Sequence, residues 1–322
     1  MLLRDFLAEW SGEGDTVEVQ TSGSTGRPQR MRVCKDRMLA SARMTCDFLG
    51  LQPGDSALLC MNLRYIGAKM MVVRSLERGL RLISMPPSSH PLATIDEKID
   101  LAAMVPLQVY AALQVPEEAE RLRGVRHLLI GGVAIDAALE AQLRGFPNNV
   151  WSTYGMTETL SHIALRRVNG DGATDFYTPL PGVTGSQAEN GCLTIEAPAL
   201  CPEKLFTNDL LDLLPDGRFR ILGRADNTII SGGVKVQAEE LERLLRPFLS
   251  KPFMITWIAD ARLGQSVVLL SEESSPESRC QSADLPPYWR PRHWLRVDKI
   301  PLTETGKPAR AAAHELAVER LS

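Results

Sequence analysis

The chain has 322 residues, and its 44% hydrophobic content is enough for one large or two ordinary domains. Its formal net charge of −3 argues against nucleic acid as the main partner, because nucleic-acid binding usually requires a strongly basic protein face. The six cysteines form no CxxC pair and the five histidines no HExxH spacing, so neither a structural zinc site nor a disulfide framework is expected.

The first ten residues, MLLRDFLAEW, do not have the pattern of a signal peptide, because Asp5 and Glu9 interrupt their apolar character. No run of about 18 apolar residues follows, so we expect no membrane-spanning helix. Cysteines without a pairing pattern fit a reducing compartment. These features predict a globular cytoplasmic protein with no membrane partner.

Strand and helix patterns alternate along the first half of the chain. The alternating TVEVQ predicts a strand over 16–20, and the spacing from Met31 onward predicts a helix that ends before Pro53. Strands and helices then alternate over 56–63, 66–80, 80–85, 99–106, 106–113, 125–132, 136–146 and 149–155. This alternation predicts α/β architecture with largely parallel sheets.

The pattern changes after residue 175. Short strands with turns at 189–191 and 215–217 predict an antiparallel meander. Further on, the sequence predicts a glycine turn in SGGVKV, helices over 238–248 and 309–321, and strands over 253–260, 266–273 and 293–300. We predict a large N-terminal domain, 1–224, with mixed or parallel sheets, packed helices and the meander, and a small mobile α+β C-terminal domain, 225–322.

The segment TSGSTG is the first candidate ligand site; its members are Thr21, Ser22, Gly23, Ser24, Thr25 and Gly26. Its glycines let the backbone turn so that several N–H groups point to one place, and its hydroxyl groups add donors. A helix after the loop would direct its N-terminus at the same place, which favours a polyphosphate ligand. The segment is not a Walker A loop, and a Ser/Thr/Gly loop by itself is more often an exposed connection.

Several short motifs follow this loop in a recognisable order: IGG, YGMTE, TND, GRAD, SGGVKV and PLTETGK. Together with TSGSTG they resemble the adenylate-forming superfamily of acyl-CoA ligases, luciferases and peptide-synthetase adenylation domains. Longer segments, such as TYGMTETLSHIALRR and GRADNTIISGGVKV, resemble one branch, the compact o-succinylbenzoate–CoA ligases of menaquinone biosynthesis. The resemblance implies an AMP-forming acid–thiol ligase that uses ATP, Mg²⁺, coenzyme A and a carboxylic acid.

The resemblance implies that TSGSTG surrounds the β- and γ-phosphates of ATP. The family usually has a lysine where this chain has Gln29, which leaves open whether Arg27 or Arg30 supplies a cation there. Thr157 is implied to reach the α-phosphate, and Glu158 to provide a hard oxygen ligand for Mg²⁺. The alternative for Glu158 is an exposed loop acid.

The resemblance also implies ligands for the adenosine: Gly131, Gly132, Tyr154 and Gly155 for the adenine, and Asp209 and Arg224 for the ribose, with a phosphate as the alternative for Arg224. Asn208 stands where the family usually has a glycine, and asparagine tolerates a left-handed backbone better than most residues. The alternative for Asp209 is an acid at the end of a hairpin. A plain strand-to-helix turn also explains the glycine pair at 131–132.

The small domain is implied to rotate about a hinge at Asp226. In one state Lys307 acts as the catalytic residue, because an ammonium group stabilises the negative charge that develops as a carboxylate attacks the α-phosphate. In the other state Gly232 and Gly233 line the entry channel for the thiol. The alternatives are a solvated lysine on a loop and a simple tight turn.

The acyl pocket is expected to contain Lys69, Arg74, Ser161 and His162. A dicarboxylate such as o-succinylbenzoate needs a cation or donors for the carboxylate that does not react. The alternatives are that Lys69 and Arg74 extend from a helix face into solvent, and that His162 is a core histidine.

Two rival functions stay open. A relative that acts on another aryl or acyl acid, or loads a carrier protein, would share the ATP motifs and differ near Lys69 and Ser161. A degenerate nucleotide-binding protein is suggested only by Gln29 and Asn208, and Glu158 and Lys307 argue against it. Because only 20 residues precede TSGSTG, a homodimer partner is a possible cover for one face of the main sheet.

Overall fold

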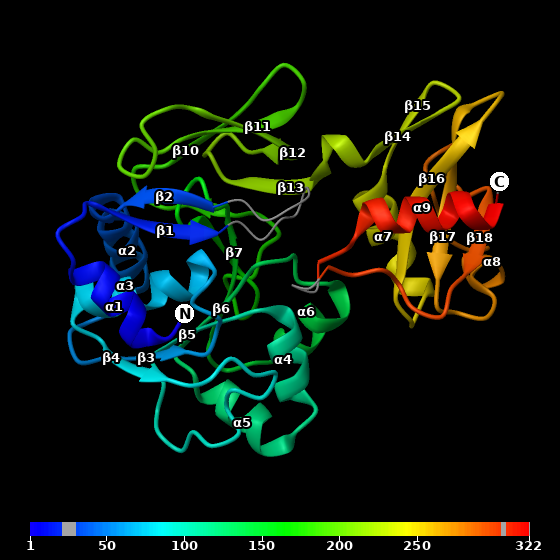
Figure 1. Ribbon diagram of the computed structural model, residues 1–322. Coiled ribbons are helices and arrows are strands. Elements are labelled where there is room, and N and C mark those ends of the chain that lie inside the picture. Colours follow the sequence, from blue (N-terminus) through cyan, green and yellow to red (C-terminus); the bar gives the residue numbers. More distant parts are fainter. Residues whose placement is uncertain (21–29, 304–306, 322) are drawn as a thin grey trace. The chain divides into compact units, whose positions relative to one another are not determined.

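The computed structural model describes residues 1–20, 30–303 and 307–321 (Figure 1). The chain divides into two compact units. Unit 1 comprises 1–186, 194–205 and 213–220, and unit 2 comprises 187–193, 206–212 and 221–322. The domain limits at 224 and 225 stay a prediction, because the units are interleaved before residue 221.

Unit 1 contains a seven-stranded sheet in the order β4-β3-β5-β6-β7-β8-β9. Its strands are β3 (Ser56–Leu59), β4 (Arg81–Ser84), β5 (Leu101–Met104), β6 (His127–Ile130), β7 (Asn149–Gly155), β8 (His162–Arg167) and β9 (Thr178–Pro179). The strands from β4 to β7 pair in parallel, whereas β7–β8 and β8–β9 pair antiparallel. The predicted α/β class with a mixed, mainly parallel sheet is confirmed.

Helices cover both faces of this sheet (Figure 1). They are α1 (Leu3–Ser11), α2 (Lys35–Leu49), α3 (Ile66–Arg78), α4 (Pro106–Leu113), α5 (Pro116–Gly124) and α6 (Ala137–Leu143). Side chains alternate between the faces of a strand. On one face, Leu58 and Leu128 share a buried cluster with Val109 of α4 and Leu139 of α6. On the other, α3 contacts β3 and β4, and α2 packs on α3.

One sequence prediction is wrong at the start of α2. Residues 30–34 form strand β2 (Arg30–Cys34), which pairs antiparallel with β1 (Thr16–Gln20) so that Gln20 lies opposite Arg30. Val33 is buried while Arg30 and Arg32 are exposed, which is the period-two pattern of a strand. No helix N-terminus therefore follows TSGSTG directly. Thr21, Ser22, Gly23, Ser24, Thr25, Gly26, Arg27 and Gln29 lie outside the described residues.

The predicted meander is a four-stranded sheet in sequential order, and its segments are divided between the two units. Its strands are β10 (Thr184–Gln187), β11 (Cys192–Glu196), β12 (Leu205–Leu213) and β13 (Phe219–Arg224).

Unit 2 has a five-stranded sheet with the path β15-β14-β17-β16, and β18 also pairs with β17. Its elements are η1 (Ala225–Asn227), β14 (Thr228–Ser231), β15 (Val234–Gln237), α7 (Ala238–Leu245), η2 (Arg246–Phe248), β16 (Phe253–Asp260), β17 (Gly264–Ser271), α8 (Pro276–Arg279), β18 (His293–Arg296) and α9 (Arg310–Leu321).

The helices of unit 2 lie on opposite faces of its sheet. Ile255 of β16 clusters with Leu241 of α7, whereas its neighbour Met254 clusters with Ala313 and Ala317 of α9. Adjacent strand residues point to opposite faces, so α7 and α9 cover the two sides. No helix within the described ranges is long and apolar enough to cross a membrane.

Candidate active site

The YGMTE motif lies where strand β7 ends. Gly155 is its last residue, and a Cβ atom there would lie 2.3 Å from the carbonyl oxygen of Ser161. The close approach of β7 and β8 therefore requires glycine at 155 even without a ligand. Thr157 and the exposed Glu158 occupy the turn between these strands. An exposed carboxylate in this turn is available to a metal ion bound mainly by phosphates.

The IGG motif lies beside YGMTE. Gly131 follows β6, and a Cβ atom there would lie 2.1 Å from Thr153 Oγ1, on the strand that leads to Tyr154. Gly132 has φ +89°, a conformation that favours glycine. The fold thus brings together the two motifs predicted to contact adenine.

Tyr154 belongs to an aromatic cluster in unit 1. Its ring centroid lies 5.4 Å from that of Phe219, in an edge-on arrangement, and 5.8 Å from that of Tyr177. These contacts fix the orientation of the Tyr154 ring.

Three of the four residues predicted for the acyl pocket form one cluster. Arg74 Nη2 donates a hydrogen bond to Ser161 Oγ over 2.6 Å. Ser161 Oγ lies 3.4 Å from His162 Nδ1, and His162 Nε2 lies 2.9 Å from Thr45 Oγ1. Thr45, on α2, was not predicted from the sequence, because nothing in the local pattern distinguishes it from a core residue.

The Arg74 guanidinium is buried among neutral groups of the described residues. Arg74 is 2% exposed, and its guanidinium also contacts the sulfur of Met71 at 3.8 Å. Its Nε has no hydrogen-bond partner among the described residues, and none of their carboxylates is within ion-pair distance. Burial lowers the pKa of Arg74 to about 10, which still leaves it charged at neutral pH.

The His162 ring is the second titratable group of this cluster. Burial, and then the nearby charge of Arg74, hold the pKa of His162 well below its ordinary value. The cluster therefore carries one positive charge and neutral donors, which suits an anionic group.

Lys69 does not join this cluster. Its side chain is buried and directed to α1 and β1, where Nζ donates to the carbonyl oxygen of Glu18 and lies 3.8 Å from Glu9 Oε2 and 5.1 Å from the Phe6 ring centroid. Burial lowers the pKa of Lys69, and the charges of Glu9 and Glu18 oppose this effect. Because both residues are buried, the alternative that Lys69 and Arg74 extend into solvent is wrong.

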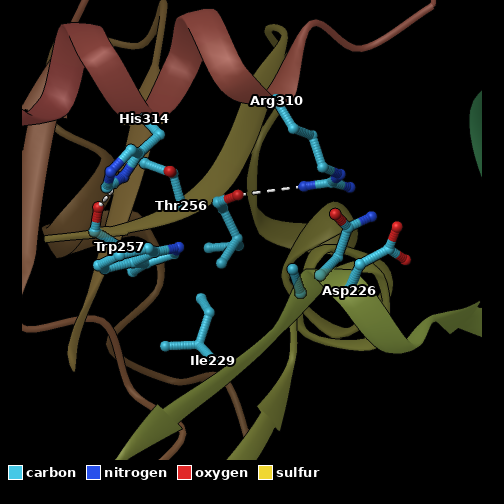
Figure 2. Close-up of a pocket in the computed structure, with 9 residues that line it drawn as sticks. Asp226, Ile229, Thr256, Trp257, Arg310 and His314 are labelled. Atoms are coloured by element: carbon cyan, nitrogen blue, oxygen red, sulfur yellow. Dashed lines mark hydrogen bonds between the residues drawn. The ribbon is translucent and has the colours of Figure 1, made fainter. Parts of the chain in front are cut away.

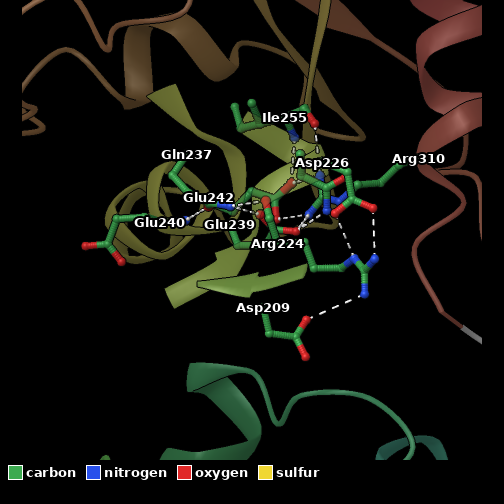
Figure 3. A network of polar contacts seen from close by, with 10 residues as sticks. Asp209, Arg224, Asp226, Gln237, Glu239, Glu240, Glu242, Ile255 and Arg310 are labelled. Atoms are coloured by element: carbon green, nitrogen blue, oxygen red, sulfur yellow. Dashed lines mark hydrogen bonds and ion pairs between the residues drawn. The ribbon is translucent and has the colours of Figure 1, made fainter. Parts of the chain in front are cut away.

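Asp209, Arg224 and Asp226 form an ion-pair group in unit 2 (Figure 3). Arg224 makes a bidentate contact with Asp226, Nε–Oδ1 3.1 Å and Nη2–Oδ2 2.8 Å, and its Nη1 lies 3.5 Å from Asp209 Oδ1. Although burial opposes ionisation, hydrogen bonds from Arg224 and Asn208 help to lower the pKa of Asp226. Two predicted ribose ligands and the predicted hinge residue are therefore neighbours.

This group continues into a second ion pair that the sequence did not predict. Gln237 Nε2 donates to the carbonyl oxygen of Arg224 and to Glu239. Arg310, at the start of α9, contacts Glu239 at 3.3 Å and both oxygens of Glu242 at 3.0 and 2.9 Å (Figure 3).

Gly232 and Gly233 form a two-residue hairpin turn between β14 and β15, with φ of 60° and 81°. Two successive positive φ values are typical of a type I′ turn, so the turn geometry explains both glycines. The predicted glycine turn is confirmed, and its role in thiol entry stays a prediction.

Lys307 follows residues 304–306, which lie outside the described residues. Its N–H donates to Thr303 Oγ1 over 3.0 Å, and its carbonyl oxygen accepts from the Thr303 N–H over 2.8 Å. Burial lowers the pKa of Lys307.

A small pocket in unit 2 lies next to this ion-pair group (Figure 2). It is lined by Asp226, Asn227, Ile229, Ala238, Ile255, Thr256, Trp257, Arg310 and His314. His314 Nδ1 lies 2.8 Å from the Trp257 carbonyl oxygen, and the rings are 4.2 Å apart. The predicted nucleotide and acid ligands do not line this pocket, so it is not a candidate nucleotide site.

Within the part of the chain that the structure describes, no three histidine, cysteine, aspartate or glutamate side chains gather as a metal cluster, and the six cysteines are free. A Mg²⁺ ion that binds mainly to phosphates needs only one or two protein carboxylates, so the exposed Glu158 carboxylate would fit such an ion. The expected homodimer stays a prediction.

Comparisons with known proteins identify relatives along most of the chain. A family model described as AMP-binding enzyme matches residues 17–186. The 2-succinylbenzoate–CoA ligases of Salmonella typhimurium and Escherichia coli are 27% and 28% identical over 91% and 86% of this chain, which spans 67% and 63% of their lengths. A linear gramicidin synthase of Brevibacillus parabrevis is 25% identical over 94% of this chain and 7% of its own length.

Solved structures show the same architecture. An acyl-CoA synthetase (AMP-forming)/AMP-acid ligase II-like protein from Dyadobacter fermentans is 34% identical, with a TM-score of 0.67 over 96% of this chain and 91% of its own. A MenE from Bacillus subtilis in complex with ATP and magnesium is 21% identical, with a TM-score of 0.75 over 91% of this chain and 68% of its own.

Proposed function

Because the chain belongs to the AMP-binding enzyme family, as its motifs predicted, we propose that it is an ATP-dependent, AMP-forming o-succinylbenzoate–CoA ligase of menaquinone biosynthesis. The observation that carries the choice of substrate is the buried Arg74 guanidinium, which contacts Ser161 and has no carboxylate partner among the described residues. A buried cation is costly unless an anion compensates it. A dicarboxylic acid supplies that anion through the carboxylate that does not react.

The first step forms an acyl-adenylate. A carboxylate oxygen of the acid attacks the α-phosphorus of ATP, the bond between this phosphorus and the bridging oxygen breaks, and pyrophosphate leaves. In the second step the thiolate of coenzyme A attacks the acyl carbon, and AMP leaves with the carbon–oxygen bond electrons. Two steps are easier than one, because AMP is a better leaving group than the oxide ion that a thiolate would have to displace from the free carboxylate.

The residues that act on the reacting atoms are proposed to be Lys307, Thr157 and Glu158. Lys307 stabilises the charge that develops between the carboxylate and the α-phosphate, and Thr157 donates to that phosphate. Glu158 would hold a Mg²⁺ ion, which would neutralise phosphate charge. The exposed Glu158 and half-buried Thr157 at the end of β7 support these roles.

The adenosine is proposed to bind to Gly131, Gly132, Tyr154, Gly155, Asp209 and Arg224, and the phosphates to 21–26. The adjacency of the IGG and YGMTE motifs and the Arg224–Asp209 contact support this assignment. We propose a large domain over 1–224 and a mobile domain over 225–322, with a hinge at Asp226. Rotation about this hinge is proposed to bring Lys307 to the site in one state, and Gly232 and Gly233 in the other.

Of the residues expected in the acyl pocket, we retain Arg74, Ser161 and His162. The contacts of Lys69 with α1 and β1 favour a structural role for Lys69.

A second candidate is a ligase that loads a carrier protein or activates another acid. The similarity to a linear gramicidin synthase over 94% of this chain favours it. It shares the adenylation step and differs in the acid and in the thiol.

Pyrophosphate release, measured with ATP, Mg²⁺ and a panel of acids, tests the proposal. The panel contains 2-succinylbenzoate, both mono-acids obtained by removing one carboxylate, aryl acids and amino acids. Release that is strongest with 2-succinylbenzoate and thioester formation with coenzyme A are expected. Release with another acid alone would replace the substrate assignment, and no release with any acid would favour a degenerate protein.

A further inference from the structure

Thr159 lies between the residues proposed to act on the nucleotide and those proposed to bind the acid. It is fully buried, at 0% exposed, although it sits in the turn that contains the exposed Glu158. Thr157 and Glu158 precede it, and Ser161 and His162 follow it. No local sequence pattern distinguishes Thr159 from the other residues of this turn.

The Thr159 hydroxyl joins the two ends of this turn. Its Oγ1 accepts a hydrogen bond from the Met156 N–H over 3.0 Å, and lies 3.0 Å from the Met156 carbonyl oxygen and 2.8 Å from that of Ser161. A hydroxyl has one proton and two acceptor positions. One side chain therefore connects the residue before Thr157 to the residue that contacts Arg74.

The backbone of the turn is strained at the next residue. Leu160 is buried and has φ 66°, a left-handed conformation that is uncommon outside glycine, asparagine and aspartate. Its N–H donates to the Thr157 carbonyl oxygen over 2.9 Å, and the Ser161 N–H donates to that of Thr159 over 2.7 Å. Such strain persists only when the surrounding contacts impose it, and the Thr159 hydroxyl makes several of those contacts.

We propose that Thr159 is a positioning residue that fixes the spacing between the nucleotide ligands Thr157 and Glu158 and the acid-binding residues Ser161 and Arg74. The proposal rests on the proposed function and adds to it a determinant of specificity. Alignment of the two substrates requires both groups of ligands to be held in one geometry, and a displacement of 1 Å is enough to slow such a reaction about 100-fold. Because Thr159 is fully buried, it is proposed to act through these neighbours and not by contact with a substrate.

The test compares Thr159→Val, which keeps the shape and removes the hydroxyl, with Thr159→Ser, which keeps the hydroxyl. Thr194→Val is the matched control, because Thr194 is also buried and its hydroxyl contacts Ser186 at 2.6 Å in a different sheet. Pyrophosphate release is measured with 2-succinylbenzoate and with its two mono-acids. Calorimetric titration with 2-succinylbenzoate alone gives a readout that does not depend on turnover.

For Thr159→Val we expect kcat/KM with 2-succinylbenzoate to fall about 100-fold. Discrimination against the reactive mono-acid, which keeps only the carboxylate that reacts, should fall about tenfold, and so should affinity for 2-succinylbenzoate. Thr159→Ser should keep all three quantities within about threefold of the wild-type values, and Thr194→Val should lower only the unfolding temperature. If Thr159→Val loses stability like Thr194→Val but keeps discrimination and affinity, Thr159 is merely structural and the proposal is overturned. Wild-type protein that activates no acid contradicts the proposed function, and this proposal with it.

Discussion

Arg74 of unit 1 and Arg310 of unit 2 are surrounded in opposite ways. In unit 1, Arg74 is fully buried and its hydrogen-bond partner is a neutral hydroxyl group, Ser161 Oγ. In unit 2, Arg310 contacts both oxygens of Glu242, one oxygen of Glu239 and the carbonyl oxygen of Ile255 (Figure 3). Among the described residues, Arg74 thus has no carboxylate partner, whereas Arg310 is fully compensated.

This difference separates two uses of a guanidinium group. A compensated arginine stabilises the elements it joins, here α7, β16 and α9, and removing it leaves carboxylates unpaired. An uncompensated one lowers stability and gains its partner when an anionic ligand binds. Substitution of Arg310 should therefore change mainly stability, whereas substitution of Arg74 should change mainly substrate discrimination.

The largest effect, a loss of activity, is expected from Lys307→Ala. Lys307 is the residue of unit 2 that is proposed to contact the reacting atoms, whereas Arg310 is paired with carboxylates. Loss of one group that stabilises developing charge typically slows a reaction about 10²- to 10³-fold. Pyrophosphate release should fall by this factor, whereas thioester formation from supplied acyl-adenylate should change less than about threefold, as rapid-quench assays of both half-reactions can measure. Equal losses in the two half-reactions would remove the role given to Lys307.

The next largest effect is expected from Arg310→Ala, which leaves Glu242 of α7 without its cation. Breaking such a pair costs about 3 kcal/mol of unfolding free energy, measured by urea denaturation. The double variant Arg310→Met with Glu242→Leu should recover most of this loss, because it removes both charges. Arg243→Ala, which breaks the more exposed contact with Glu240, should cost less than about 1 kcal/mol and serves as the control.

Acid pH should destabilise unit 1 through its neutral histidines. Burial, and then the charges of Arg126 and Arg167, lower the pKa of His127 to about 4. The unfolded chain, with an ordinary pKa near 6.5, then binds more protons than the folded chain between pH 6.5 and 4, so stability falls as pH falls through this window. A pKa lowered from 6.5 to about 4 corresponds to at most about 3 kcal/mol of unfolding free energy, lost over this window.

His127→Asn should flatten this pH dependence in urea titrations at pH 7 and pH 4.5. Burial also lowers the pKa of His162, so protonation of His162 should likewise destabilise the folded chain at acid pH. If the unfolding free energy of His127→Asn falls between pH 7 and pH 4.5 as much as that of the wild type, His127 does not cause the loss of stability at acid pH.

The smallest effect is expected from Arg74→Met, which should change substrate discrimination without lowering the unfolding free energy. A charge-assisted hydrogen bond contributes about 1.5–3 kcal/mol, so discrimination between 2-succinylbenzoate and the reactive mono-acid should fall about 10- to 100-fold. The unfolding free energy should stay equal or rise, because the substitution removes a buried cation that has no carboxylate partner in the described part of the chain.

Arg78→Met is the matched control on the same helix, since Arg78 pairs with Asp47 and donates to the Leu51 carbonyl oxygen. It should lower stability and leave discrimination unchanged. A loss of stability in Arg74→Met as large as that in Arg78→Met would contradict the division between the two kinds of arginine.

Much of the fold was predictable from periodicity. Helix α3 begins where its pattern predicted, because it has a long, consistent apolar face, and strand β7 begins at the predicted residue 149. Strand β2 was mistaken for the start of a helix, since its five residues acquire strand structure only by pairing with β1. The short helices α5 and α8 were not predicted, because four to nine residues carry little periodic signal.

By itself, the sequence determined the family, the α/β class, and the glycines and polar residues of the motifs, because these depend on local backbone requirements and on residues close together in the chain. The tertiary structure alone decided which cations are compensated. Lys69 and Arg74 are five residues apart on α3 and equally buried, but about 140° apart around the helix, so one reaches the backbone of β1 and the other Ser161. Which neighbour a buried charge meets depends on how distant segments pack, and no local pattern encodes that.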